Sequence, residues 1–224
     1  MSAKLLLDSA NLDEIKKALD YYPIEGVTTN PSLMAKENVT DPFKQLSLIR
    51  NIIGDERCLH IQVVHRDAEN MVKQALKIKE EFGENVFVKI PTTKEGLKAM
   101  KALDGIVDVT ATLIYTPAQG ILAAFSGAKH LAIYHNRIEA NFMDPLKTID
   151  TLNKLIVDKD LSCGIIAASF KNISQVVDAY AHGAQCCTLP FSVLESSTNS
   201  ALLADAEGQF IKDWENSNLP ISWI

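Results

Sequence analysis

Eight short runs of apolar or β-branched residues alternate with longer segments of helical periodicity, and this alternation constrains the fold of the 224-residue chain most. Each segment between two runs is long enough for a crossover helix, so neighbouring strands should be parallel. Eight such units in a chain of this length predict a (β/α)8 (TIM) barrel, in one domain over residues 1–224. The expected strands are Leu5–Asp8, Gly26–Thr28, Cys58–Val64, Val86–Ile90, Val107–Thr112, Leu131–Tyr134, Gly164–Ala168 and Cys186–Thr188.

Residues that cap helices mark where the helical segments begin. The expected caps are Asn11, Asp41, Asp67, Thr93 and Asn172. A doubly wound dinucleotide-binding sheet would need a glycine-rich turn after the first strand, but the sequence there is Asp-Ser-Ala-Asn. A further helix over residues 200–214 follows the eighth unit. Little of its own barrel remains for it to cover, so we expect it to pack on a neighbouring subunit of a homo-oligomer.

Composition narrows the class of ligand and the compartment. The formal charge is -6, which argues against a nucleic-acid partner, whereas a small anion needs only two or three local basic side chains. The apolar run near the N-terminus is too short for a signal peptide or a membrane span. The four cysteines contain no CxxC pair, so we expect reduced thiols and a cytoplasmic protein without a membrane partner.

The polar residues at the ends of the expected strands are the candidates for function, because catalytic groups of such barrels lie at the C-terminal ends of strands. Lys89 is the most informative of them, since it interrupts an apolar strand. Alternation places Phe87 and Lys89 on the inner face and Val86, Val88 and Ile90 against helices. Burial would favour the neutral amine, which can attack a carbonyl. The alternative is a lysine that reaches solvent or pairs with an acid such as Asp8.

The other strand ends offer groups for proton transfer. Asp8 could orient a substrate hydroxyl or assist proton transfer, or it could only cap the helix that begins near Asn11. Gln62, Thr112 and Tyr134 are neutral groups that could hold a water molecule. Each of these three, taken alone, could equally be a hydrogen-bonded polar group of the core.

Arg137, Ser169 and Lys171 suit a phosphate group. Arg137 follows the sixth strand, and the other two lie at the turn into the helix that begins near Asn172. Helix N-termini attract anions, and barrels of this kind often bind phosphate near their last strands. The alternative is a pair of solvated surface charges, which fits Lys171 better than Arg137.

A metal site is the main alternative to lysine chemistry. His60 and His65 flank the third strand, and His130 and His135 flank the sixth. Within each pair the odd spacing turns the two side chains to opposite faces. Neither pair forms a ligand set, and we expect no metal.

Several stretches in order along nearly the whole chain resemble the transaldolase family, and most closely its short fructose-6-phosphate aldolase branch. The combination of Gly-Val-Thr-Thr-Asn-Pro-Ser and Val-Lys-Ile-Pro is the most specific part. The matching stretches are residues 7–11, 26–32, 88–91, 95–97, 118–120, 134 with 136–138, 167–171 and 188–190.

This resemblance implies a class I enzyme without a cofactor, in which Lys89 forms a Schiff base with a sugar phosphate. It implies that Asp8, Thr29 and Asn30 lie around the dihydroxyacetone part, and that Arg137, Ser169 and Lys171 hold the phosphate. It also implies a ring-shaped oligomer, a pentamer or a decamer. Gln62 and Tyr134 are the pair found in the aldolase branch, whereas true transaldolases carry glutamate at the first position and usually phenylalanine at the second.

The expected reaction is cleavage of fructose 6-phosphate to dihydroxyacetone and glyceraldehyde 3-phosphate. The first alternative is a transaldolase of the pentose phosphate pathway, which passes the dihydroxyacetone unit to erythrose 4-phosphate. A barrel that binds sugar phosphates without catalysis and a metal-dependent aldolase are the remaining alternatives. A Lys89→Met protein that kept full activity would mean that Lys89 is inert, and would favour the binding barrel. Loss of activity in EDTA would favour the metal-dependent aldolase.

Overall fold

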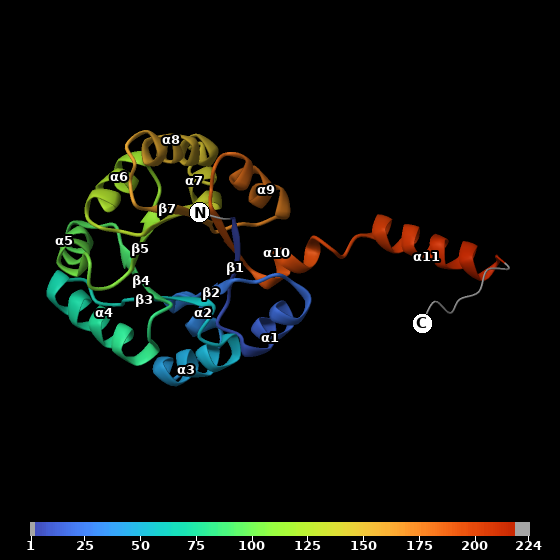
Figure 1. Ribbon diagram of the computed structural model, residues 1–224, viewed down its shortest axis with the longest axis horizontal. Coiled ribbons are helices and arrows are strands. Elements are labelled where there is room, and N and C mark those ends of the chain that lie inside the picture. The colour runs from blue at the N-terminus through green and yellow to red at the C-terminus, as the bar shows by residue number, and fades with distance from the viewer. Residues whose placement is uncertain (1–2, 218–224) are drawn as a thin grey trace.

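The computed structural model describes residues 3–217, and in it eight parallel strands close into a barrel in sequence order. Helices surround the barrel on its outer side (Figure 1). The predicted (β/α)8 barrel is therefore confirmed. The strands are β1 Lys4–Asp8, β2 Gly26–Thr28, β3 Cys58–Gln62, β4 Val86–Pro91, β5 Val109–Ile114, β6 His130–Tyr134, β7 Gly164–Ala168 and β8 Cys186–Leu189. The helices are α1 Leu12–Tyr21, α2 Pro31–Lys36, α3 Pro42–Ile53, α4 Ala68–Phe82, α5 Lys94–Leu103, α6 Pro117–Phe125, α7 His135–Glu139, α8 Pro145–Asp158, α9 Ile173–Ala181, α10 Phe191–Ser196 and α11 Ala201–Glu215.

Two strands, β3 and β5, have boundaries that differ by two residues from the sequence prediction, and four others differ by one residue at one end. Strand β5 begins two residues late because the Val107 amide still donates to Leu103, at the end of α5. It also continues to Ile114, past a break in register at which Leu113 has a φ of 60°. Strand β3 ends at Gln62, and the amide of Val64 donates to a glutamine side chain of α4 instead of a strand. In both cases a local hydrogen bond sets the boundary, and hydrophobicity does not reveal it.

The five predicted helix caps all hold. Each of these side chains accepts a hydrogen bond from a backbone amide in the first turn of its helix, at α1, α3, α4, α5 and α9. Asn11 accepts from two amides of α1. These caps fix where each helix leaves the rim of the barrel, and so fix the loops that surround the strand ends.

The interior of the barrel contains buried polar side chains of the strands, and the shell between strands and helices contains most of the hydrophobic core. Val86, Val88 and Ile90 of β4 are fully buried in that shell. Pairing across the sheet places Lys89 opposite Gln62 on one side and Thr110 on the other. The alternation predicted for β4 is therefore confirmed, and Lys89 faces the barrel interior.

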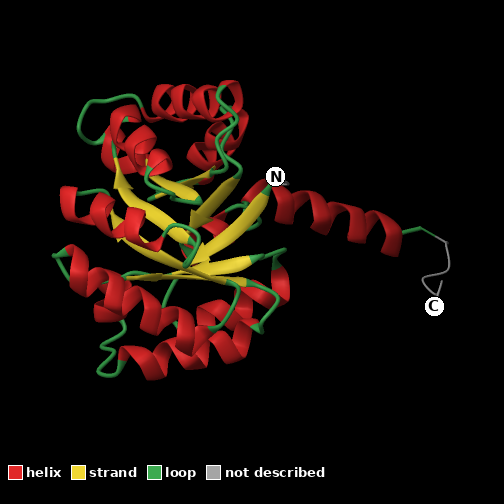
Figure 2. Ribbon diagram, turned by 60° about the vertical axis from the view of Figure 1, so that its left-hand side comes forward, coloured by secondary structure: helices red, strands yellow, loops and turns green. Residues whose placement is uncertain are grey.

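Helix α11 extends away from the barrel (Figures 1 and 2). It begins at the cap Ser200 and buries none of its residues. Leu202 and Phe210 are 84% and 74% exposed, although a helix in a folded protein normally buries an apolar face. Within residues 3–217 no helix combines the length and the apolar character needed to cross a bilayer.

Candidate active site

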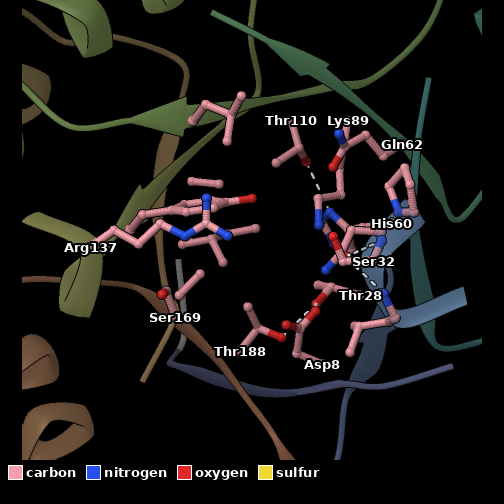
Figure 3. Close-up of a pocket in the computed structure, with 18 of the residues that line it drawn as sticks. Asp8, Thr28, Ser32, His60, Gln62, Lys89, Thr110, Arg137, Ser169 and Thr188 are labelled. Carbon is pink, nitrogen blue, oxygen red and sulfur yellow. Dashed lines mark hydrogen bonds between the residues drawn. The ribbon is translucent and has the colours of Figure 1, made fainter. Parts of the chain in front are cut away.

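A cavity of about 470 Å³ opens at the C-terminal ends of the strands. Figure 3 shows Arg137 and Ser169 on one side of it and Lys89, Gln62 and His60 on the other. Its lining also includes Asp8, Thr28, Asn30, Ser32, Lys36, Thr110, Leu113, Tyr134 and Thr188. Most of the residues predicted from the strand ends thus share one cavity.

Lys89 lies in this cavity with only 5% of its surface exposed. Its Nζ donates to the carbonyl oxygen of Thr29 at 2.9 Å. Among residues 3–217 it makes no ion pair within 4.0 Å, so the alternative of a lysine paired with Asp8 is wrong. Burial lowers the pKa of Lys89, and the more distant charge of Asp8 opposes that shift. The site therefore makes the neutral amine easier to form than it is for an exposed lysine.

Asp8 is held by hydroxyl groups. Thr28 donates to its Oδ1 at 2.6 Å and lies 2.7 Å from the hydroxyl of Thr188. Burial raises the pKa of Asp8, while Lys89 and the Thr28 hydrogen bond act in the opposite direction. Because Asn11 caps α1, the alternative of Asp8 as that cap is wrong.

Tyr134 and Thr112 form a second hydroxyl pair, with their oxygens 2.9 Å apart. Thr112 is fully buried, and Tyr115 packs edge-on against Tyr134 with 5.9 Å between ring centroids. Burial raises the pKa of Tyr134, against the effects of Thr112 and Arg137. The phenol is therefore protonated at neutral pH and can donate a proton or a hydrogen bond.

Arg137 and Ser169 line the side of the cavity across from Lys89 (Figure 3). Ser169 has a φ of 67°, a left-handed conformation that is uncommon for serine, and its carbonyl accepts from the amide of Asn136. Lys171 is exposed and does not line the cavity. The structure thus brings two of the three candidate phosphate ligands together.

The two candidates that follow β2 differ in their placement. Asn30 lines the cavity, and its Oδ1 accepts from Ser32 and Leu33 as the cap of α2. Thr29 meets Lys89 through its backbone carbonyl. Thr29 also lines a second, mostly apolar pocket, which shares Asn30 and Gln62 with the first. Its buried hydroxyl makes no hydrogen bond with any described residue.

Six polar residues of the cavity were not among the sequence candidates for this site: Thr28, Ser32, Lys36, His60, Thr110 and Thr188. His60 could have been found, because alternation along β3 places residues 60 and 62 on the same face. The closeness of Thr28 to Thr188 depends on closure between β8 and β1, which no local pattern reveals.

Histidines from two different strands, His60 of β3 and His130 of β6, lie close together. His60 stacks on Phe87 and hydrogen-bonds Thr110 at 2.9 Å, and its ring centroid lies 5.6 Å from that of His130. Burial lowers the pKa of both, to about 4 for His130. In the part of the chain that the structure describes, no three histidine, cysteine, aspartate or glutamate residues are grouped so that they could hold a metal.

Comparison with known proteins places this geometry in a family. The family model described as "Transaldolase/Fructose-6-phosphate aldolase" matches residues 5–218. The chain belongs to this family. A Streptococcus pneumoniae protein named "Probable fructose-6-phosphate aldolase" is 39% identical over 213 residues, which are 94% of this chain and 96% of that protein.

A more distant likeness concerns the fold alone. The crystal structure of inosine 5′-monophosphate dehydrogenase from Legionella pneumophila matches with a TM-score of 0.56 at 17% identity. The match covers 84% of this chain and 58% of that one. This likeness carries no functional argument, because unrelated enzymes share such barrels.

Proposed function

We propose that this chain is a class I aldolase, which cleaves fructose 6-phosphate to dihydroxyacetone and glyceraldehyde 3-phosphate and catalyses the reverse condensation. The environment of Lys89 is the observation that carries the proposal. Its amine is buried in the cavity, and that burial lowers its pKa. A neutral amine is the form that attacks a carbonyl carbon. The name of the family and that of the Streptococcus relative both include this activity.

The reaction begins when Nζ of Lys89 adds to the C2 carbonyl of the ketose. Loss of water leaves a protonated imine, which can accept the electron pair of the C3–C4 bond. The carbonyl of Thr29 orients the amine before substrate binds, and Asn30 contacts the part that becomes dihydroxyacetone. Asp8 orients a substrate hydroxyl or assists proton transfer from the same cavity.

Cleavage requires the C4 hydroxyl to lose its proton while the C3–C4 electron pair moves into the imine. We assign the proton transfers to a water molecule held by Gln62, Thr112 and Tyr134. The hydroxyl pair of Thr112 and Tyr134 supports this assignment. Glyceraldehyde 3-phosphate then leaves, and an enamine remains on Lys89. Protonation of that enamine at C3 and hydrolysis of the imine release dihydroxyacetone and restore the amine.

The phosphate end of the substrate lies on the opposite side of the cavity in this proposal. Arg137 supplies a planar, permanently charged donor group that suits phosphate, and Ser169 supplies a hydroxyl. Lys171 is exposed beside the same turn, where its flexible side chain adds positive charge outside the cavity.

Transaldolase is the alternative, and the family name includes it. In that reaction the same enamine attacks erythrose 4-phosphate and yields sedoheptulose 7-phosphate, as in the pentose phosphate pathway. Gln62 lines the cavity as a neutral amide where true transaldolases carry a carboxylate, and Tyr134 supplies a phenol. Both features favour hydrolysis of the enamine over its transfer.

The purified protein should be incubated with fructose 6-phosphate, with and without erythrose 4-phosphate, while both cleavage products are followed. Steady release of glyceraldehyde 3-phosphate and free dihydroxyacetone without an acceptor supports the aldolase. Turnover that requires erythrose 4-phosphate identifies a transaldolase instead. A Lys89→Met protein that kept full activity would contradict lysine chemistry in both enzymes.

We further propose that residues 1–224 act as one barrel domain, whose ends, residues 1–2 and 218–224, lie outside the described residues. Segment 200–214 then packs on a second copy in a pentamer or decamer. The exposed apolar side chains of α11 support this assembly. All four cysteines are free thiols, which suits the reducing cytoplasm.

A further inference from the structure

Arg137 contacts the ring of Tyr134 in addition to lining the cavity. The centre of its guanidinium lies 5.3 Å from the centroid of that ring, within the range of a cation–π interaction. Among the described residues this guanidinium makes no ion pair within 4.0 Å, and it is exposed. One cation therefore faces both the space for an anion and the aromatic ring of a proposed catalytic residue.

The cation–π contact alone holds the arginine weakly. Such contacts stabilise little at exposed sites, and a free arginine side chain has many rotamers. An anion that accepts two parallel hydrogen bonds fixes the guanidinium plane far more strongly. The phenol at the other end of the ring is already tied to the buried hydroxyl of Thr112. Fixing Arg137 would therefore restrict Tyr134 from both ends.

We propose that a dianion bound at Arg137 activates the site as well as anchoring the substrate, because it fixes the guanidinium over Tyr134 and so positions the phenol. Arg137 is then a positioning residue for Tyr134. This inference rests on the proposed aldolase function. It implies that a free dianion speeds the condensation of dihydroxyacetone with an aldehyde that has no phosphate of its own.

The charge of Arg137 does not change the protonation state of Tyr134 at neutral pH. The positive charge of Arg137 lowers the pKa of Tyr134, against the larger effect of burial. A bound dianion neutralises that charge, and the phenol is protonated in either case, so the activation comes from its position. Condensation needs a donor near the aldehyde oxygen, which becomes the C4 hydroxyl, and the protonated phenol can serve. Phosphate on the substrate would thus raise kcat in addition to lowering KM.

The test supplies the aldehyde and the dianion as two separate molecules, in place of one phosphorylated aldehyde. Condensation of dihydroxyacetone with D-glyceraldehyde is measured as phosphite dianion is added, at an ionic strength held constant with chloride. We expect saturable activation of about tenfold, the size of effect that remote binding groups give when their energy is used in the transition state. Phosphite should also compete with fructose 6-phosphate, which measures its binding separately from activation.

Variants then test the route through Tyr134. Tyr134→Phe keeps the ring that Arg137 faces, so phosphite should still compete with fructose 6-phosphate but should no longer activate condensation. Arg137→Leu should abolish activation and raise the KM for fructose 6-phosphate. Arg137→Lys keeps the charge without the planar donor group and should give weaker activation than wild type. Circular dichroism checks that each variant is folded.

Three outcomes overturn the inference in distinguishable ways. Phosphite that competes but never activates in the wild type means that the anion site is not coupled to catalysis. Equal activation in Tyr134→Phe and wild type means that coupling does not pass through the phenol. No condensation of dihydroxyacetone with D-glyceraldehyde or with glyceraldehyde 3-phosphate would remove the proposed function, and this inference with it.

Discussion

Among individual residues, burial acts in opposite directions on the two charged groups at the base of the cavity. It lowers the pKa of Lys89 and raises that of Asp8, so each becomes easier to hold in its neutral form. The hydroxyl of Thr28 counteracts the effect on Asp8 with a hydrogen bond of 2.6 Å. The site can therefore combine a neutral amine with a carboxylate that remains available for proton transfer.

Thr28→Val should make the enzyme more sensitive to acid. The hydrogen bond from Thr28 lowers the pKa of Asp8, so its loss raises that pKa further. If Asp8 must be ionised, the acidic limb of kcat/KM for fructose 6-phosphate moves to higher pH, with a rate loss of about tenfold or more. Thr188→Val is the matched control, because it leaves the bond between Thr28 and Asp8 in place. An unshifted limb in Thr28→Val would contradict a catalytic role for Asp8.

The buried histidines should make the fold itself sensitive to acid. The folded-state pKa of His60 is lowered by burial, so the unfolded chain binds more protons and stability falls as pH drops below about 6.5. Each histidine that stays neutral costs about 1.4 kcal/mol per pH unit below that point. The free energy of unfolding, measured in urea between pH 7 and pH 5, should decrease accordingly.

His60→Phe with His130→Phe should reduce this dependence, since neither ring can then be protonated in the unfolded chain, while buried His135 keeps its own contribution. His65→Gln, at an exposed position, is the matched control and should leave the slope unchanged. An identical slope in the double variant and in wild type would show that other groups cause the loss of stability in acid.

Among the secondary-structure elements, β4 with α5 is the unit that positions Lys89. Gly96 of α5 lies so close to the end of β4 that a Cβ there would meet the backbone oxygen of Pro91. Backbone cannot move aside as a flexible side chain can, so Gly96→Ala should lower Tm by several degrees, for a loss of about 2 kcal/mol. Gly208→Ala in α11, where nothing lies within 4 Å, is the control and should not lower Tm. Equal Tm values for Gly96→Ala and wild type would mean that the two elements are not closely packed in solution.

The sequence was sufficient to predict elements whose cause is local. Alternation along β4 predicted the inward direction of Lys89, and the five caps predicted where helices begin. The bulge at Leu113 was not predicted, because a left-handed leucine leaves no mark in hydrophobic periodicity. Lys171 was grouped with Arg137 and Ser169 from its position at a turn, but the direction of its side chain depends on packing. Contacts such as Thr28 with Thr188 depend on closure of the barrel.

For the whole molecule, α11 extends away from the barrel and buries none of its residues. If it packs on a second copy, Leu202→Glu with Phe210→Glu should lower the mass measured by sedimentation, because two buried charges oppose the contact. Glu207→Lys, an exposed charge change in the same helix, is the control for altered charge alone. A double variant with the mass of wild type would contradict the proposed role of the helix.

The most direct test of lysine chemistry is covalent trapping. The protein should be treated with borohydride in the presence of dihydroxyacetone, digested, and examined by mass spectrometry, with Lys89→Met as the control. Burial and the lowered pKa of the amine predict one reduced adduct, on the peptide that contains Lys89, and none in the variant. No adduct in wild type, or an adduct on another lysine, would contradict the proposal that Lys89 forms the Schiff base.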